Sequence, residues 1–158
     1  MLAQEIYDAL KANFGDAIIE IKDEKPSDAF IIVKAENLFD ICLELRDNSE
    51  MLFDYLMCLS GVDSGDSLTA VYHLYSFKYS HKIVIKTLVP KTQPDVPSVE
   101  LVWRSADWHE REAYDLIGIN FTGHHNLIRI LCPYDWEGHP LRKDYVTPEF
   151  YHGIRVPY

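Results

Sequence analysis

Residues 67–90, SLTAVYHLYSFKYSHKIVIKTLVP, form the stretch that decides the predicted fold. The runs 68–79 and 82–89 within it are rich in β-branched and aromatic residues, which favour β-strands. Only Ser80 and His81 separate the two runs. So short a link predicts an antiparallel hairpin, and further elements are predicted on both sides of it.

Upstream of the hairpin, the pattern predicts two helices and two short strands. Residues 2–14 carry an apolar side chain at every fourth position, the spacing of an amphipathic helix, and a glycine follows to end it. Residues 17–21 and 29–33 favour strands, and residues 23–28, which include a proline, favour a turn. Asn37 is suited to cap a second helix that continues to about Arg46.

Four further segments complete the prediction. Residues 51–59 favour a short helix or buried turn, and residues 63–67 favour a turn. Three prolines in residues 90–97 predict a polar loop, and residues 99–103 a strand. A helix is then predicted from Ser105 or Asp107 to a glycine at position 118.

The order helix, strand, strand, helix, three strands, helix favours an α+β fold. We expect a two-layer domain, with helices packed on a mixed β-sheet. The chain has 158 residues, of which 47% are hydrophobic, enough for one domain with a substantial core. From Asn120 onward glycines and prolines recur, which predicts mostly irregular structure. The expected division is a domain at residues 1–145 and an extended C-terminal tail at residues 146–158.

Charge and composition exclude several classes of function. The formal net charge of -10 argues against a nucleic-acid-binding surface, which needs a clustered basic face. No apolar run approaches the roughly 20 residues that span a bilayer, and no signal peptide is recognised at the N-terminus. The cysteines, Cys42, Cys58 and Cys132, are odd in number and far apart. We therefore expect reduced thiols in a cytoplasmic protein.

Motifs for self-contained chemistry are missing from the sequence. There is neither G-x-G-x-x-G nor G-x-x-x-x-G-K-[ST], so nucleotide binding is not expected. The seven histidines show no H-x-x-x-H or H-E-x-x-H spacing, and three isolated cysteines do not fit an iron–sulfur cluster. We accordingly expect no catalytic, cofactor-binding or metal-ligating residue in this chain.

The charged triplet Glu110-Arg111-Glu112 lies on the last predicted helix. Successive helical residues are about 100° apart, so at least one of the three charges must lie near the buried side and needs a partner. One interpretation is internal: Arg111 pairs with Asp115 one turn later, and the glutamates cap the first turn or face water. Another is an ion-pair network at an interface with another protein. A hydrolase with paired carboxylates is disfavoured, because Glu110 and Glu112 point to different sides of the helix.

The C-terminal segment mixes aromatic and basic residues with prolines. Tyr145, Phe150 and Tyr151, together with Arg142 and Arg155, are of the types enriched at protein interfaces. A disordered tail would contain fewer aromatic residues. Composition alone leaves two alternatives open: the tail folds back on its own sheet, or it docks on a partner.

Three blocks of residues resemble the signature of one protein family. The first reads Glu110-Arg111-Glu112, two residues, Asp115 and two apolar residues. The second begins at His124 and ends at Ile130-Leu131, and the third is residues 137–145, EGHPLRKDY. These blocks are similar to those of the 30 kDa subunit of respiratory complex I, the bacterial NADH:quinone oxidoreductase. The resemblance is tightest over residues 99–145. The family usually has a basic residue at position 128 and prolines at positions 125 and 146, where this chain has Ile128, His125 and Val146.

The resemblance implies a peripheral-arm subunit of the proton-translocating NADH:quinone oxidoreductase, with a structural and assembly role. It implies that FMN, iron–sulfur clusters and quinone are held by partner subunits, and that this chain docks chiefly on the large, hydrogenase-like quinone-site subunit. The expected location is the cytoplasmic side of the cell membrane, reached only through partners. The alternative is the equivalent subunit of a membrane-bound hydrogenase or of a ferredoxin- or deazaflavin-linked dehydrogenase, and a self-sufficient hydrolase is a more distant one.

The residues expected at the interface with partner subunits lie in the three blocks and the tail. They are Glu110, Arg111, Glu112, Asp115, His124, Arg129, Glu137, His139, Arg142, Lys143, Asp144, Tyr145, Phe150 and Tyr151.

Overall fold

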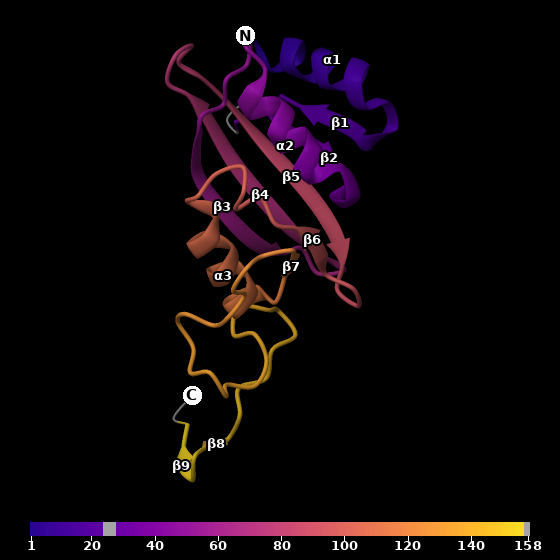
Figure 1. The fold of residues 1–158 in the computed structure, drawn as a ribbon. Coiled ribbons are helices and arrows are strands. Elements are labelled where there is room, and N and C mark those ends of the chain that lie inside the picture. The colour runs from indigo at the N-terminus through magenta and orange to yellow at the C-terminus, as the bar shows by residue number, and fades with distance from the viewer. Residues whose placement is uncertain (24–27, 157–158) are drawn as a thin grey trace.

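The computed structural model describes residues 1–23 and 28–156 (Figure 1). Most helices and strands lie before residue 123, and regular structure is sparse after it. The elements in chain order are α1 (Ala3–Phe14), the 3-10 turn η1 (Gly15–Ala17), β1 (Ile18–Lys22), β2 (Phe30–Val33), η2 (Ala35–Asn37), α2 (Leu38–Asp47), β3 (Tyr55–Asp63), β4 (Ser67–Ser76), β5 (His81–Pro90), β6 (Asp95–Pro97), α3 (Ala106–Ile117), β7 (Asn120–Thr122), β8 (Phe150–Tyr151) and β9 (Ile154–Arg155).

Five strands form one mixed sheet in the order β1-β2-β5-β4-β3. β4 and β5 pair antiparallel from Ser67 opposite Pro90 to Ser76 opposite His81, which confirms the predicted hairpin. β2 runs parallel to β5, whereas the β1–β2 and β3–β4 pairs are antiparallel. The hairpin therefore occupies the middle of the sheet, and segments from before it in the sequence flank it on both sides.

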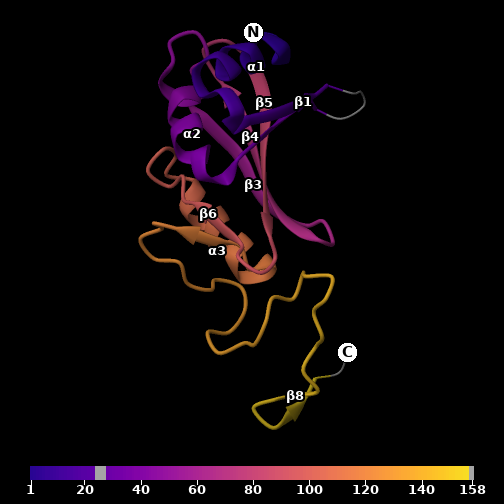
Figure 2. The same ribbon diagram turned by 90° about the vertical axis from the view of Figure 1, so that its right-hand side faces the viewer.

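The core lies between this sheet and the helices, which Figures 1 and 2 show on one of its faces. Helix α1 buries Ile6 and Leu10, and α2 buries Ile41 and Leu45. Alternate residues of the strands pack against these helices, because successive side chains of a strand point to opposite faces of the sheet. In β4 these are Leu68, Ala70, Tyr72 and Leu74, each fully buried. The predicted α+β class, with helices packed on a mixed sheet, is confirmed.

Helix α3 packs against β3 at Gly61. A Cβ atom on Gly61 would lie 3.2 Å from Cβ of Ile117 and 3.3 Å from Cβ of Ala113. A side chain at this position would therefore hold the helix away from the strand. The helix ends at Gly118, whose φ of 81° is left-handed and whose N–H bonds to the carbonyl groups of Ala113 and Tyr114. The predicted limits of this helix are confirmed.

Two predicted elements are wrong. Residues 51–59 do not form a helix, because most of them belong to the edge strand β3. Glycine, serine and cysteine interrupt the strand signal of β3, and both of its faces carry apolar residues, so no two-residue period is visible. Residues 99–103, predicted as a strand, form turns in which the N–H groups of Val102 and Trp103 bond to the carbonyl of Val99. The strand pairing falls instead on β6, inside the predicted loop.

Two smaller predictions need adjustment. Helix α2 starts after Asn37, as expected, but the Asn37 side chain makes no capping hydrogen bond, and the 3-10 turn η2 leads into the helix instead. The predicted turn at residues 23–28 falls mainly on residues outside those described.

After α3 the chain leaves the sheet. β7 pairs in parallel with β6. Residues 123–149 then contain neither helix nor strand, and the chain reaches the small β8–β9 hairpin far from the sheet (Figures 1 and 2). Within the described part of the chain, no helix combines the length and apolarity that a membrane crossing requires.

Candidate functional site

Two acidic residues of α3, Glu110 and Asp115, are completely buried. The triplet around Glu110 is thus divided, since Arg111 is half-buried and Glu112 is exposed. A buried carboxylate is stable only with hydrogen-bond donors or an opposite charge nearby. Glu110 accepts hydrogen bonds from residues that precede the helix, and Asp115 accepts them from residues that follow it.

Glu110 fastens α3 to the turn that precedes it. Its Oε2 accepts a hydrogen bond from the Ser98 hydroxyl at 2.6 Å, and its Oε1 accepts one from the Val99 N–H at 2.7 Å. Burial raises the pKa of Glu110 to about 7, although these two hydrogen bonds act in the opposite direction. Nearby Glu100 and Asp107 add to the rise, because like charges disfavour ionisation. Glu110 is therefore a carboxyl group that titrates near neutral pH.

A second group of polar side chains lies beside Glu110. Nε2 of His124 is 3.2 Å from a carboxylate oxygen of Asp107, 3.6 Å from one of Glu100 and 3.9 Å from one of Glu110. His125 reaches Glu100 twice, through its backbone N–H at 2.8 Å and its Nδ1 at 2.6 Å. Of these residues, the sequence had indicated only Glu110 and His124.

Asp115 forms hydrogen bonds with the segment that follows β7. Its Oδ2 accepts hydrogen bonds from three consecutive backbone N–H groups, those of Ile130 at 3.0 Å, Leu131 at 2.7 Å and Cys132 at 2.9 Å. Its Oδ1 lies 2.7 Å from a guanidinium nitrogen of Arg129. Burial alone would raise the pKa of Asp115, but these donors outweigh it and hold the pKa below its usual range.

The predicted pairing of Arg111 with Asp115 is wrong. Arg111 lies over the ring of Trp108, with its guanidinium carbon 4.7 Å from the ring centroid, and its Nε donates to the carbonyl of Ile128 at 3.3 Å. The partner of Asp115 is Arg129, fourteen residues further along the chain. A one-turn spacing rule does not find such a pair.

The C-terminal end of α3 is covered by residues 139–142. The Arg142 guanidinium donates to the carbonyls of Ile117 at 2.7 Å and Gly118 at 3.2 Å. Nδ1 of His139 bonds to the carbonyl of Asp115 at 3.0 Å. These carbonyls have no partner within the helix, and a cation beside them also interacts favourably with the helix dipole. A Cβ atom on Gly118 would overlap the His139 ring, so this position requires glycine.

Residues 143–144 are tied to the sheet by Asp63 at the end of β3. Asp63 accepts the Lys143 backbone N–H at 2.9 Å and the Lys91 ammonium at 2.8 Å, and Asp144 lies 3.5 Å from the same ammonium. The Lys91 ammonium, followed by the backbone donors, holds the pKa of Asp63 well below its usual range. No local sequence pattern indicates this contact, because its partners are far apart along the chain.

The remaining predicted site residues lie further out. The Tyr145 hydroxyl accepts the indole N–H of Trp136 at 2.9 Å, and the Tyr151 hydroxyl donates to Asp135 at 2.7 Å. Glu137 and Phe150 are exposed. The structure therefore joins Tyr145 and Tyr151 to the segment around Asp135 and Trp136 rather than to the five-stranded sheet.

The segment after residue 127 presents many apolar side chains to solvent. Seven of them are more than half exposed: Ile128, Leu131, Tyr134, Leu141, Val146, Phe150 and Ile154. Scattered exposed apolar residues are common, but seven within 27 residues are typical of a surface that another protein covers.

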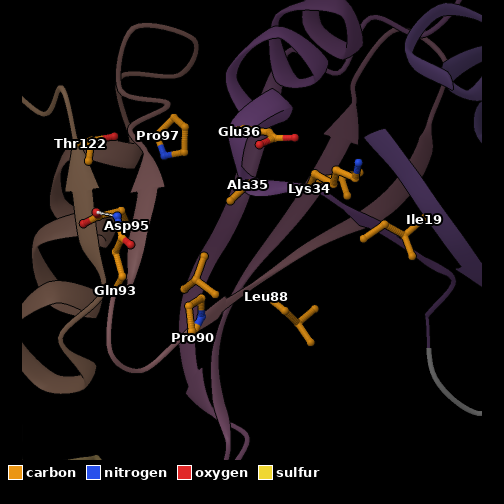
Figure 3. Close-up of a pocket in the computed structure, with 12 residues that line it drawn as sticks. Ile19, Lys34, Ala35, Glu36, Leu88, Pro90, Gln93, Asp95, Pro97 and Thr122 are labelled. Carbon is orange, nitrogen blue, oxygen red and sulfur yellow. Dashed lines mark hydrogen bonds between the residues drawn. The ribbon is translucent and has the colours of Figure 1, made fainter. Parts of the chain in front are cut away.

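A separate cavity of about 660 Å³ lies between η2, the end of β5 and the β6–β7 pair (Figure 3). Lys34, Glu36 and Asp95 are among the polar residues that line it, together with apolar ones such as Leu88. The Asp95 carboxylate already accepts from Gln93 at 3.3 Å and from Asn120 at 2.6 Å. None of the predicted site residues lines this cavity, and the described lining residues do not assemble a nucleophile with a base.

The raised pKa of Glu110 predicts a specific pH dependence. A carboxyl group with a raised folded-state pKa stabilises the fold fully below its ordinary value of 4.5, and this contribution is lost as the pH rises through about 7. Glu110→Gln should remove the effect. The unfolding free energy of the wild type relative to Glu110→Gln should fall by about 3 kcal/mol from about pH 4 to about pH 8. Chemical denaturation at a series of pH values measures this difference, and a constant difference would contradict it.

The contacts of Asp115 and Arg111 predict that substitution of Asp115 lowers the stability far more than substitution of Arg111. Asp115→Ala leaves three backbone N–H groups and Arg129 without their acceptor and should lower the unfolding free energy by about 3–5 kcal/mol. Arg111→Ala should cost less than about 1 kcal/mol, because Arg111 makes only partly exposed contacts. Thermal and urea melts of both variants measure the effects. Similar losses in the two variants would show that Asp115 does not hold the segment.

Comparison with known proteins relates this geometry to a family. A family model described as the 30 Kd subunit of the respiratory-chain NADH dehydrogenase matches residues 31–151. The chain is 45% identical over 154 residues to an NADH-quinone oxidoreductase subunit of Chloroherpeton thalassium, covering 96% of this chain but 64% of that relative. It is 44% identical over 155 residues to the corresponding subunit of Chlorobium phaeobacteroides, covering 96% of this chain and 93% of that relative.

Two solved structures share the fold of this chain. A trypsin-resistant fragment of Nqo5 superposes with a TM-score of 0.66 and 25% identity, covering 80% of this chain and all of the fragment. A chain of the membrane-bound sulfane sulfur reductase, an archaeal respiratory membrane complex, superposes with a TM-score of 0.75 over 91% of this chain and 85% of its own length. At 21% identity, the second match shows a shared fold. With a matching family model and relatives above 40% identity, the chain belongs to the 30 kDa subunit family of the respiratory-chain NADH dehydrogenase.

Proposed function

We propose that this chain is a peripheral-arm subunit of a proton-translocating NADH:quinone oxidoreductase, and that it acts by assembling and bracing that arm. Membership of the family and the NADH-quinone oxidoreductase relatives support the proposal. The observation that carries it is the apolar segment after residue 127, which buried carboxylates hold in place although it lies outside the sheet. An apolar surface held by such hydrogen bonds suits a structural subunit better than a catalyst.

In this proposal the electrons pass through other chains. FMN, iron–sulfur clusters and quinone would be held by partner subunits. The sequence lacks nucleotide-binding motifs, and its three cysteines, which are free, lie in separate parts of the chain. The related role in a membrane-bound hydrogenase or a ferredoxin-linked dehydrogenase is not favoured, because the relatives above 40% identity are NADH-quinone oxidoreductase subunits.

The proposed docking partner is the large quinone-site subunit, with other peripheral-arm subunits nearby. The predicted interface residues include one group that makes contacts within this chain and another that is exposed. Glu110, Asp115, Arg129, His139 and Arg142 make contacts within this chain, and would serve the interface by holding its shape. The exposed residues Glu112, Glu137, Lys143, Asp144 and Phe150 are accessible for direct contact with a partner.

Membrane association would be indirect. The described residues include no helix suited to cross a membrane. The subunit would lie at the cytoplasmic side of the cell membrane, attached there through its partners.

The docking role predicts that the tail contributes more to assembly than to folding. Deletion of residues 147–158 should change the melting temperature little, because the described tail contacts are with Asp135 and Trp136, outside the sheet. It should weaken binding to the large quinone-site subunit by about a hundredfold, since each aromatic side chain buried at an interface contributes about 1.5–3 kcal/mol. Melting curves and co-purification with that partner measure the two effects.

A pair of point variants makes this test sharper. Phe150→Ala removes a ring that is 56% exposed in the tail. Phe77→Ala removes a ring that is 65% exposed in the turn between β4 and β5. Phe150→Ala should weaken the binding of the large quinone-site subunit, and Phe77→Ala should leave it unchanged. A tail deletion that lowers the melting temperature strongly, with unchanged binding per folded molecule, would make the tail part of the domain core.

The absence of redox cofactors from this chain is also testable. The purified chain should show no flavin or iron–sulfur absorption and should not oxidise NADH, because the motifs that would hold these groups are missing. An absorption spectrum and an iron determination suffice. A flavin or iron signal in a one-to-one ratio with the protein would refute this part of the proposal.

A further inference from the structure

A small cavity near the start of α3 brings together donor atoms of the kind that bind metal ions. It has a volume of about 340 Å³ and is lined by Glu100, Leu101, Arg104, Asp107 and His125. One donor atom each from Glu100, Asp107, His124 and His125 lie within 4.8 Å of one another. The sequence did not predict this group, because Glu100 and Asp107 are far from the histidines along the chain.

The hydrogen bonds of His124 are already satisfied. Its Nδ1 accepts the backbone N–H of Asn126 at 3.0 Å, so the proton of the neutral ring must be on Nε2. Nε2 in turn lies 3.3 Å from the carbonyl oxygen of Asp107 and donates to it. A metal ion on Nε2 would move that proton to Nδ1, where it would oppose the Asn126 N–H. His124 is therefore a hydrogen-bond donor and not a metal ligand. Its ring stacks on that of His125, with centroids 5.1 Å apart and planes 13° apart.

Three donor atoms remain available in the cavity. An oxygen of Asp107, Oδ1, is buried with no hydrogen-bond partner among the described residues, although Nε2 of His124 lies 3.2 Å away. Oε2 of Glu100 and Nδ1 of His125 are 2.6 Å apart, and the His125 side chain is 63% exposed. In the described part of the chain, no lysine or arginine lies within ion-pair distance of Glu100 or Asp107. Arg104 also lines the cavity, but among the described residues neither carboxylate forms an ion pair with a lysine or an arginine.

We propose that Glu100, Asp107 and His125 bind a divalent first-row transition-metal ion, with Zn²⁺ the best fit, and that water completes its coordination. Two carboxylates and one imidazole form an oxygen–nitrogen ligand set suited to zinc. Mg²⁺ and Ca²⁺ prefer oxygen ligands alone and gain little from His125. Binding needs only a shift of the His125 proton from Nδ1 to Nε2, while stacking on His124 keeps the ring in place.

The proposal is independent of the docking role and applies to the full chain in isolation. The competing occupant is a basic side chain of a partner subunit, which would enter the same cavity and pair with the same carboxylates. Metal binding to the purified chain distinguishes the two, since the second occupant requires the partner.

The test is a titration of the EDTA-stripped full-length chain with Zn²⁺, followed by calorimetry and by the melting temperature. We expect one Zn²⁺ per chain and a higher melting temperature with the ion, because a ligand that binds only the folded state stabilises it. His125→Ala and Asp107→Asn should each weaken binding by at least about tenfold. His152→Ala is the matched control: His152 is also 63% exposed and pairs with a carboxylate, that of Asp135, but lies outside the cavity. Its binding should be unchanged.

Two results would overturn the proposal. One is the failure of the wild-type chain to bind Zn²⁺ more tightly than His125→Ala does. The other is a loss of binding in His152→Ala equal to that in His125→Ala, which would place the ion elsewhere. Because His125 is exposed, its substitution leaves the fold intact even if Asp107→Asn does not fold.

Discussion

The buried carboxylate of Asp115 is the interaction on which the C-terminal third of this protein depends. Residues 130–132 form neither helix nor strand, so their backbone N–H groups have no regular partner. One carboxylate oxygen accepts all three, and Arg129 balances its charge. Arg129 also donates to the carbonyl of Gly138 at 2.8 Å, which draws the next loop toward the helix. An irregular segment is thereby given a defined path without a core of its own.

The two buried acids of α3 show how donors determine charge. Glu110 has two hydrogen-bond donors and no cation, and burial raises its pKa. Asp115 has three N–H donors and a guanidinium, and its pKa is lowered. Their contributions to stability therefore change with pH in opposite directions. That of Glu110 is lost as the pH rises through about 7, whereas that of Asp115 is lost only in acid, as the pH falls through its lowered pKa. Near pH 7 the contribution of Asp115 is therefore fully present, whereas most of the contribution of Glu110 has been lost.

Local patterns in the sequence predicted the elements that local patterns control. The spacing of Ile6 and Leu10 marks α1, and the β-rich runs around Ser80 mark the central hairpin, because periodicity and turn length are visible within a dozen residues. β3 was missed because Gly61 serves the packing of α3, a contact made more than fifty residues away. Such a glycine looks like a strand breaker until its partner is known.

The site was predictable in part for the same reason. The charged triplet indicated that a carboxylate must be buried, but not that Glu110 would bond to Ser98 and Val99. Arg129 was identified through the family resemblance, whereas its pairing with Asp115 depends on a loop path that only the fold defines. The cavity at Glu100 and His125 is a further case, since its members come from two turns and a helix end.

Hydrogen–deuterium exchange of individual amides tests the central claim most directly. If the Asp115 carboxylate holds the segment, the N–H groups of Ile130, Leu131 and Cys132 should exchange as slowly as the middle of α3, despite lying in irregular structure. The exposed residues nearby, such as Tyr134, should exchange fast. Exchange of all three amides at the rate of Tyr134 would show that the carboxylate does not order this segment, and would contradict the account.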